Sequence, residues 1–184
     1  MKVSKAATRY AKALLELAEE KSVQDQVLAD MALVAQTLEA SKDLAMLVES
    51  KVVSNDQKLK AFTTIFKDQL QEMTFEFFSL LTKNERADII PDISVEYPRL
   101  YKLDKRILDI EVRTASKLSA EALNKIKTIM SEGWNSVEVT EVIDPSLIGG
   151  FVVKGNHTVY DASVASQLRE ISNEIVDYSH IAQL

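Results

Sequence analysis

The chain has 184 residues, 46% of them hydrophobic, so it can bury a core as one ordinary domain or two small ones. Its formal net charge of −6 disfavours a nucleic-acid partner, because an acidic surface repels phosphates. The absence of cysteine excludes disulfides, thiolate nucleophiles and cysteine metal ligands. No apolar run approaches the roughly 18 residues that cross a bilayer, so we expect no membrane insertion; residues 1–5 also lack the apolar centre of a secretory signal.

The first 105 residues contain no glycine and are rich in Ala, Leu, Lys and Glu, a composition that favours helices joined by short turns. Ser22 and Asp25 have the spacing of a capping box, which predicts a helix start at Ser22. The sequence predicts six helices in all. Four of them begin at Ser4, Ser22, Ser41 and Ser54, and two cover about 71–83 and 87–105.

Two prolines fall in the sixth of these helices. Pro91 lies near its first turn, where proline is tolerated. Pro98 lies further along and should kink or interrupt the helix, because proline lacks the N–H that an interior position donates.

The pattern changes near Arg106, where apolar and polar residues alternate over 108–113 and predict a half-buried strand. Ser119 precedes a helix, Val137 and Val139 begin a second strand, and a hairpin joined by Gly155, Asn156 and His157 precedes a closing helix. We therefore predict a mainly α protein. Its parts are an N-terminal six-helix bundle at 1–105 and a small α+β C-terminal domain at 106–184.

Residues that could carry chemistry are sparse. His157 and His180, the two histidines, belong to no spaced ligand cluster, so we expect no metal site. Gly149 and Gly150 lie in no nucleotide-binding motif, so we expect no cofactor. No positioned acid, base or nucleophile is visible, and the sequence indicates a binding protein rather than an enzyme.

The first and fifth expected helices carry more apolar surface than one core contact needs. Their apolar arcs cover roughly 200° and 220°, against the 100° or so of an ordinary surface helix. Either both helices are buried on two sides, or each has one face in the core and another lining a groove for an incoming amphipathic helix. Under the second interpretation Met73, Phe77, Leu80 and Leu81 form the core face of the fifth helix. The expected partner-binding residues are then Ala6, Tyr10, Ala13, Leu14, Leu17, Thr74, Phe75, Phe78 and Thr82.

Three ordered segments resemble a known family, the delta subunits of F-type ATP synthases and the mitochondrial oligomycin-sensitivity-conferring protein. The first is Ala7-Thr-Arg-Tyr-Ala-Lys-Ala-Leu14, similar to the family's N-terminal opening. The second comprises Phe78-Ser-Leu-Leu-Thr-Lys-Asn-Glu-Arg86 and Ile89-Ile-Pro-Asp-Ile93. The third is Asp144-Pro-Ser-Leu-Ile-Gly-Gly-Phe-Val-Val153 followed by Val159-Tyr-Asp-Ala-Ser163 and Leu168-Arg169.

The resemblance implies a non-catalytic stator connector at the cytoplasmic face of the inner or plasma membrane, with the plastid stroma as the less favoured alternative. It implies that the N-terminal bundle binds the N-terminal helix of an alpha subunit between its first and fifth helices. It also implies that the C-terminal domain contacts the b subunits of the peripheral stalk. Two alternatives stay open on the residues alone: a helical adaptor of another assembly, and a small hydrolase using Asp or Glu in the C-terminal domain.

Overall fold

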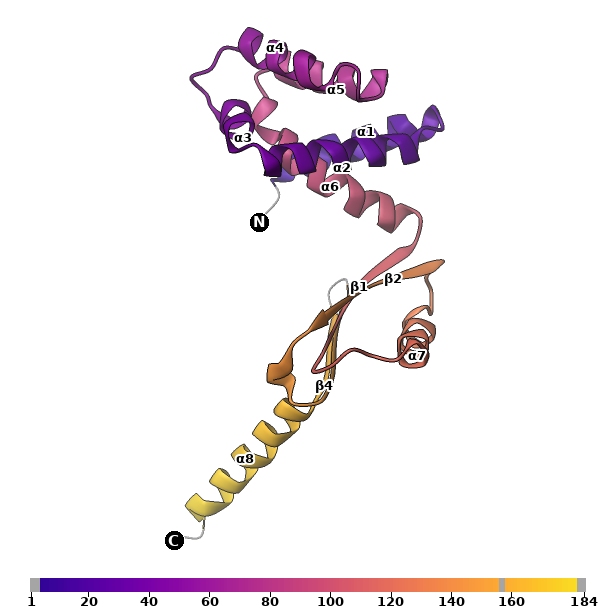
Figure 1. Cartoon of the computed structure of the whole chain (residues 1–184), viewed down its shortest axis with the longest axis vertical. Helices are drawn as coiled ribbons and strands as arrows, with labels where there is room; N and C mark the ends of the chain where they lie inside the picture. Colours follow the sequence, from indigo (N-terminus) through magenta and orange to yellow (C-terminus); the bar gives the residue numbers. More distant parts are fainter. Residues whose placement is uncertain (1–3, 156–157, 182–184) are drawn as a thin grey trace. The chain divides into compact units, whose positions relative to one another are not determined.

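The structure is a computed structural model that describes residues 4–155 and 158–181. The chain divides into two compact units, Met1–Asp104 and Lys105–Leu184, one residue before the predicted boundary (Figure 1). Helices dominate the described residues and the sheet lies wholly in the second unit, so the prediction of a mainly α protein with a C-terminal α/β part is confirmed.

The described part of the first unit is built of α-helices and one 3₁₀ helix. Serine side chains begin three of the helices: Ser4, Ser41 and Ser54 accept hydrogen bonds from the backbone N–H three residues on, as predicted. The elements are α1 (Lys5–Glu20), α2 (Gln24–Ala40), α3 (Lys42–Glu49), α4 (Asn55–Phe66), α5 (Glu72–Lys83), η1 (Ala87–Ile89) and α6 (Ile90–Asp104).

The predicted helix start at Ser22 is wrong. Ser22 has φ 57° and ends α1 instead, because the Val23 N–H bonds the Ala18 carbonyl and the Ser22 N–H bonds the Glu19 carbonyl. This is the hydrogen-bond pattern by which a residue in the left-handed conformation ends an α-helix. The short connection to α2 demands this tight reversal, and α2 begins without a side-chain cap.

Pro98 does not interrupt its helix, contrary to one of the predicted outcomes. α6 runs continuously from Ile90 to Asp104 with Pro98 inside it. The helix packs along both α1 and α2, and Tyr97, the residue before the proline, is fully buried. This tertiary packing maintains the helix where one backbone hydrogen bond is missing.

The core of the first unit joins α6 to α1 and α2, and α4 to α5. α2 contributes the predicted face at helical spacing, with Val27, Met31, Val34 and Leu38 buried. Phe62 and Phe66 of α4 are buried as predicted, and their rings lie 5.7 Å apart.

The second unit contains a four-stranded sheet in the order β2-β1-β3-β4. β1 pairs with β2 in parallel through the crossover helix α7, and the other two pairings are antiparallel. The core lies between the sheet and α7, where Ile126 packs with Leu108, Ile110, Val112 and Val153. The elements are β1 (Ile107–Thr114), α7 (Ala120–Met130), β2 (Ser136–Ile143), η2 (Pro145–Leu147), β3 (Gly150–Gly155), β4 (Thr158–Ser163) and α8 (Val164–Ile181).

The predicted strand, helix, strands, helix order is confirmed for this unit, including the cap at Ser119, which accepts from the Ala122 N–H. Asn156 and His157 of the predicted hairpin turn lie outside the described residues, and so does the His180 side chain. Gly150 enters β3 at φ 74°, and a Cβ there would lie 2.1 Å from the Ala162 carbonyl oxygen, so only glycine fits. Hence Gly150 has a structural role.

Candidate functional site on the first and fifth helices

α1 presents two apolar faces, as its wide arc predicts. One face is buried in the unit's core and consists of Ala7, Ala11, Leu14, Leu15 and Ala18. Beside it runs a second stripe that is only partly covered: Ala6 and Tyr10 are half-buried, Ala13 is exposed, and Leu17 is 37% exposed. These four residues follow the spacing i, i+4, i+7, i+11, so they form a straight stripe over three helical turns.

α5 adjoins this stripe through Phe77. The rings of Tyr10 and Phe77 lie edge to face with centroids 6.4 Å apart. Leu80 follows Phe77 by three residues and is 55% exposed, so it continues the same flank of α5. We call the set Ala6, Tyr10, Ala13, Leu17, Phe77 and Leu80 the α1–α5 apolar face.

The two helices run in opposite directions. The Gln71 N–H, at the start of α5, donates to Asp30 Oδ2 at 3.1 Å, and Asp30 lies in the first half of α2. Only three residues separate the end of α1 from the start of α2. The start of α5 therefore lies near the end of α1, while Phe77 reaches back to Tyr10.

The structure corrects the predicted orientation of α5. Phe78 is 2% exposed and its ring lies 6.3 Å from that of Phe62, so it belongs to the core and not to an open groove. Leu80 was expected in the core and is exposed. The helix is rotated so that the flank next to α1 carries Phe77 and Leu80. Four predicted partner-binding residues, namely Leu14, Thr74, Phe78 and Thr82, are buried inside the unit.

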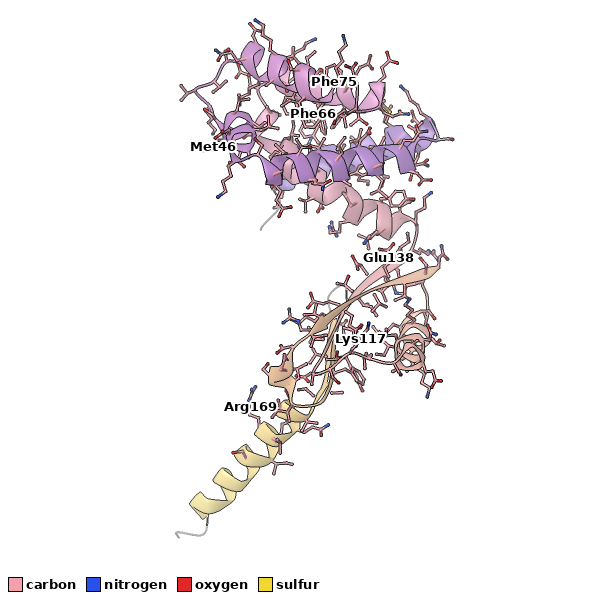
Figure 2. The ribbon with its side chains drawn as sticks, in the orientation of Figure 1. Met46, Phe66, Phe75, Lys117, Glu138 and Arg169 are labelled. Atoms are coloured by element: carbon pink, nitrogen blue, oxygen red, sulfur yellow. The ribbon has the colours of Figure 1, made fainter. Side chains whose placement is uncertain are left out.

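Phe75 is half-buried but lies on the other flank. It is two residues from Phe77, which at 3.6 residues per turn places it roughly 160° away around the helix. Figure 2 labels it on α5. Of the predicted partner-binding residues, the described face therefore retains Ala6, Tyr10, Ala13 and Leu17, all on α1.

Sequence reasoning missed Phe77 and Leu80 as surface residues, although one signal pointed to the true rotation. Asp30 interrupts the apolar face of α2, and a buried carboxylate needs donors. It finds them in α5: Asp30 Oδ2 accepts from Thr74 Oγ1 at 2.6 Å and from the Gln71 N–H. This pair of bonds fixes the start of α5 and turns Thr74 inward.

α1 is held from the opposite side by α6. The Ser4 N–H donates to Asp92 Oδ2 at 3.1 Å, and Thr8 Oγ1 donates to Glu96 Oε1 at 3.2 Å. Arg99 donates two hydrogen bonds to the Glu96 carboxylate, at 2.6 and 2.9 Å. These bonds from Arg99 hold the pKa of Glu96 below its ordinary value of 4.5, although burial acts in the other direction. The partly open stripe of α1 therefore stands on a firmly anchored helix.

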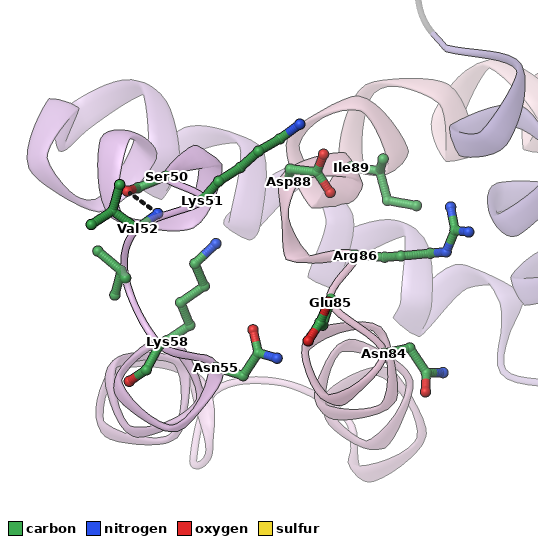
Figure 3. Close-up of a pocket in the computed structure, with 12 residues that line it drawn as sticks. Ser50, Lys51, Val52, Asn55, Lys58, Asn84, Glu85, Arg86, Asp88 and Ile89 are labelled. Carbon is green, nitrogen blue, oxygen red and sulfur yellow. Dashed lines mark hydrogen bonds between the residues drawn. The ribbon is translucent and has the colours of Figure 1, made fainter.

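A polar cleft lies elsewhere in this unit, between the α3–α4 loop and the α5–η1 turn (Figure 3). Its most buried cation is Lys58, which is 6% exposed. Lys58 Nζ donates to the Val48 carbonyl at 2.7 Å, and Val48 lies in the last turn of α3. Lys58 thus caps a helix end whose carbonyls lack intrahelical partners. Its burial has a structural explanation.

The described ranges are residues 4–155 and 158–181. Within them no three His, Cys, Asp or Glu residues gather to hold a metal ion, and no helix is long and apolar enough to cross a membrane.

The second unit has its own exposed apolar residues. On β4, one of the two edge strands, Val159 and Tyr160 are 62% and 63% exposed. Leu168 and Ile171 at the start of α8 are about half exposed. An edge strand and a helix with uncovered apolar side chains form a second candidate interface.

The comparisons with known proteins decide the family. The family model described as ATP synthase delta (OSCP) subunit matches residues 6–175. The chain belongs to this family. It is 33% identical over 177 residues to the ATP synthase subunit delta of Cytophaga hutchinsonii, covering 96% of this chain and 97% of the relative. It is 32% identical to that of Flavobacterium johnsoniae, covering 95% and 99%.

Solved structures agree on the fold. A chain of the Toxoplasma gondii mitochondrial ATP synthase hexamer matches with a TM-score of 0.70 at 19% identity, covering 94% of this chain and 98% of that one. As a delta (OSCP) family member, the chain is a non-catalytic component of the peripheral stalk of an F-type ATP synthase. The resemblance seen in its three motifs is confirmed, and the adaptor and hydrolase alternatives lose their support.

Proposed function

We propose that the α1–α5 apolar face binds the amphipathic helix at the N-terminus of an alpha subunit in the catalytic head. The N-terminal unit serves as the six-helix bundle that the family resemblance implies. The C-terminal unit contacts the b subunits, and together the two contacts keep the head from turning with the rotor. The site of action is the cytoplasmic face of the inner or plasma membrane, with the plastid stroma as the alternative location.

The observation that carries the proposal is the uncovered stripe on α1, bordered by Phe77 and Leu80. From Ala6 to Leu17 the stripe rises 11 residues, or about 16 Å, which matches three turns of a guest helix. Ala6 and Ala13 permit close approach, while Tyr10 and Phe77 offer aromatic area. A guest helix would meet this face with residues at i, i+3, i+4 and i+7.

A matched pair of substitutions tests the proposal. Leu80 of the face and Val95 on α6 are 55% and 56% exposed. Leu80→Glu and Val95→Glu should each change the free energy of unfolding by less than about 1 kcal/mol, because neither side chain is in the core. Leu80→Glu should weaken binding of a synthetic peptide of the alpha subunit's N-terminal 25 or so residues by roughly tenfold or more.

Calorimetric titration of the peptide into each variant is the measurement. Val95→Glu should bind like wild type. Wild-type affinity in Leu80→Glu would rule out the α1–α5 apolar face as the docking site. An equal loss of affinity in both variants would show that an added negative charge weakens binding wherever it is placed.

A further inference from the structure

The exposed charges along the α1–α5 apolar face are ordered by sign. Arg9 borders the first half of the α1 stripe, with Lys5 one turn before it on the same flank, and Glu16 and Glu20 border the second half; all four are exposed. Because α5 runs antiparallel to α1, its late residue Lys83 lies toward the start of α1, and its first-turn residue Glu72 lies toward the end of α1. The face thus has a basic end and an acidic end.

Helix stability explains the charge order of α5 but not that of α1. Acidic residues favour the start of a helix and basic residues its end, because the helix macrodipole is positive at the N-terminus. α5 obeys this rule with Glu72 in its first turn and Lys83 in its last. α1 has no acidic residue in its first turn and no basic residue in its last, and its charges run in the unfavourable order.

Contacts within the fold do not explain the order of charges along α1 either. Among the described residues, the ion pair on α1 joins Lys12 and Glu16 at 3.7 Å, with side chains that are 70% and 64% exposed. Such a pair contributes little, and lysine preceding glutamate is the weaker order. The charges border the one apolar stripe of α1 that the core leaves open, so the order is available to a guest helix.

We propose that the guest helix lies parallel to α1, with an acidic N-terminal half over Lys5, Arg9 and Lys83 and a basic C-terminal half over Glu16, Glu20 and Glu72. This inference rests on the proposed docking at the α1–α5 apolar face. The apolar stripe supplies contact area in either direction, whereas the charged borders discriminate between directions. An amphipathic helix with the ordinary charge order, acidic first and basic last, fits only in the parallel direction.

The direction is measured with the full chain labelled with ¹⁵N and the same alpha-subunit peptide carrying a nitroxide at one end. With the label at the peptide's N-terminus, the amide signals of residues 5–9 and of Lys83 should be attenuated. With the label at its C-terminus, the signals of residues 16–20 and Glu72 should be attenuated. The reverse pattern overturns the proposed direction while leaving the docking site in place, and a peptide that does not bind at all rejects the docking itself.

A charge reversal tests whether the charges beside the α1 stripe contribute to binding the guest helix. The double variant Lys5→Glu/Arg9→Glu should lower peptide affinity roughly fivefold or more, and the loss should shrink as salt is raised. The fold should not suffer, because acidic residues at the start of α1 agree with the helix macrodipole. The control Lys42→Glu/Lys60→Glu changes the net charge equally at exposed sites on α3 and α4 and should leave affinity within about twofold. Equal losses in the two double variants would overturn the role of the ordered border.

Discussion

The two units differ in how completely they bury their apolar residues. The described core of the first unit holds 22 buried hydrophobic residues, whereas that of the second holds five, so most of the hydrophobic stabilisation lies in the first. The first unit leaves one ordered stripe uncovered on a well-anchored helix. The second exposes apolar side chains on an edge strand and on α8. The first unit therefore presents its open apolar surface on a rigid helix, whereas the second leaves apolar side chains exposed beside a small core.

Separating the units gives the largest expected effect. A fragment of residues 1–104 should unfold cooperatively with a free energy of about 5–10 kcal/mol, in the range of single domains. A fragment of residues 105–184 should be stable by less than about 3 kcal/mol, because its core is small. Urea melts followed by circular dichroism measure both, and Trp134 fluorescence follows the second fragment independently. Equal free energies of unfolding for the two fragments would contradict the proposed difference between the units.

Phe78→Asp should be the most damaging single change in the first unit. It places an unpaired carboxylate among buried aromatic rings, at a cost of about 3 kcal/mol or more. The matched control is Phe75→Asp on the same helix, where a half-buried position should cost clearly less. Urea melts of the two variants decide the rotation of α5; a larger loss for Phe75→Asp would contradict it.

Asp30→Ala tests the bonds that set this rotation. The change leaves the Thr74 hydroxyl and the Gln71 N–H without their acceptor, and should cost about 2 kcal/mol. Asp30→Asn keeps an acceptor oxygen and should cost less. Hydrogen exchange should also quicken at the amides of residues 71–75 in Asp30→Ala. Exchange that rises uniformly across the unit would show that Asp30 supports the core in general and not the start of α5.

The smallest effect concerns pH. The pKa of Glu96 is lower in the folded state than its ordinary value of 4.5, so the unfolded state binds more protons at acid pH. The contribution of Glu96 is therefore fully present above that ordinary value and is lost as the pH falls through the lower folded pKa. Glu96→Gln should be less stable than wild type near neutral pH, and the gap should narrow below about pH 4. A gap that is constant from pH 7 to pH 3 would contradict an ionised Glu96 in the fold.

The sequence alone carried much of the fold and of the family. Helix starts at Ser4, Ser41, Ser54 and Ser119 were predictable because a cap depends on hydrogen bonds to residues three positions away. The alternation over 108–113 predicted β1 for a similar reason, since strand faces follow directly from a period of two. The α1 half of the candidate site was also predictable, because the apolar arc of that helix is wider than its buried face.

Tertiary packing decided the rest. The sequence of α5 itself does not determine which side of its wide apolar arc faces the core, because Phe77 and Phe78 are equally suited to burial. Asp30, 44 residues before Thr74 in the chain, set that rotation through a long-range hydrogen bond. Ser22 became the end of α1 rather than the start of α2, and Pro98 stayed inside a helix, because the close packing of α1, α2 and α6 outweighs the local preference of single residues.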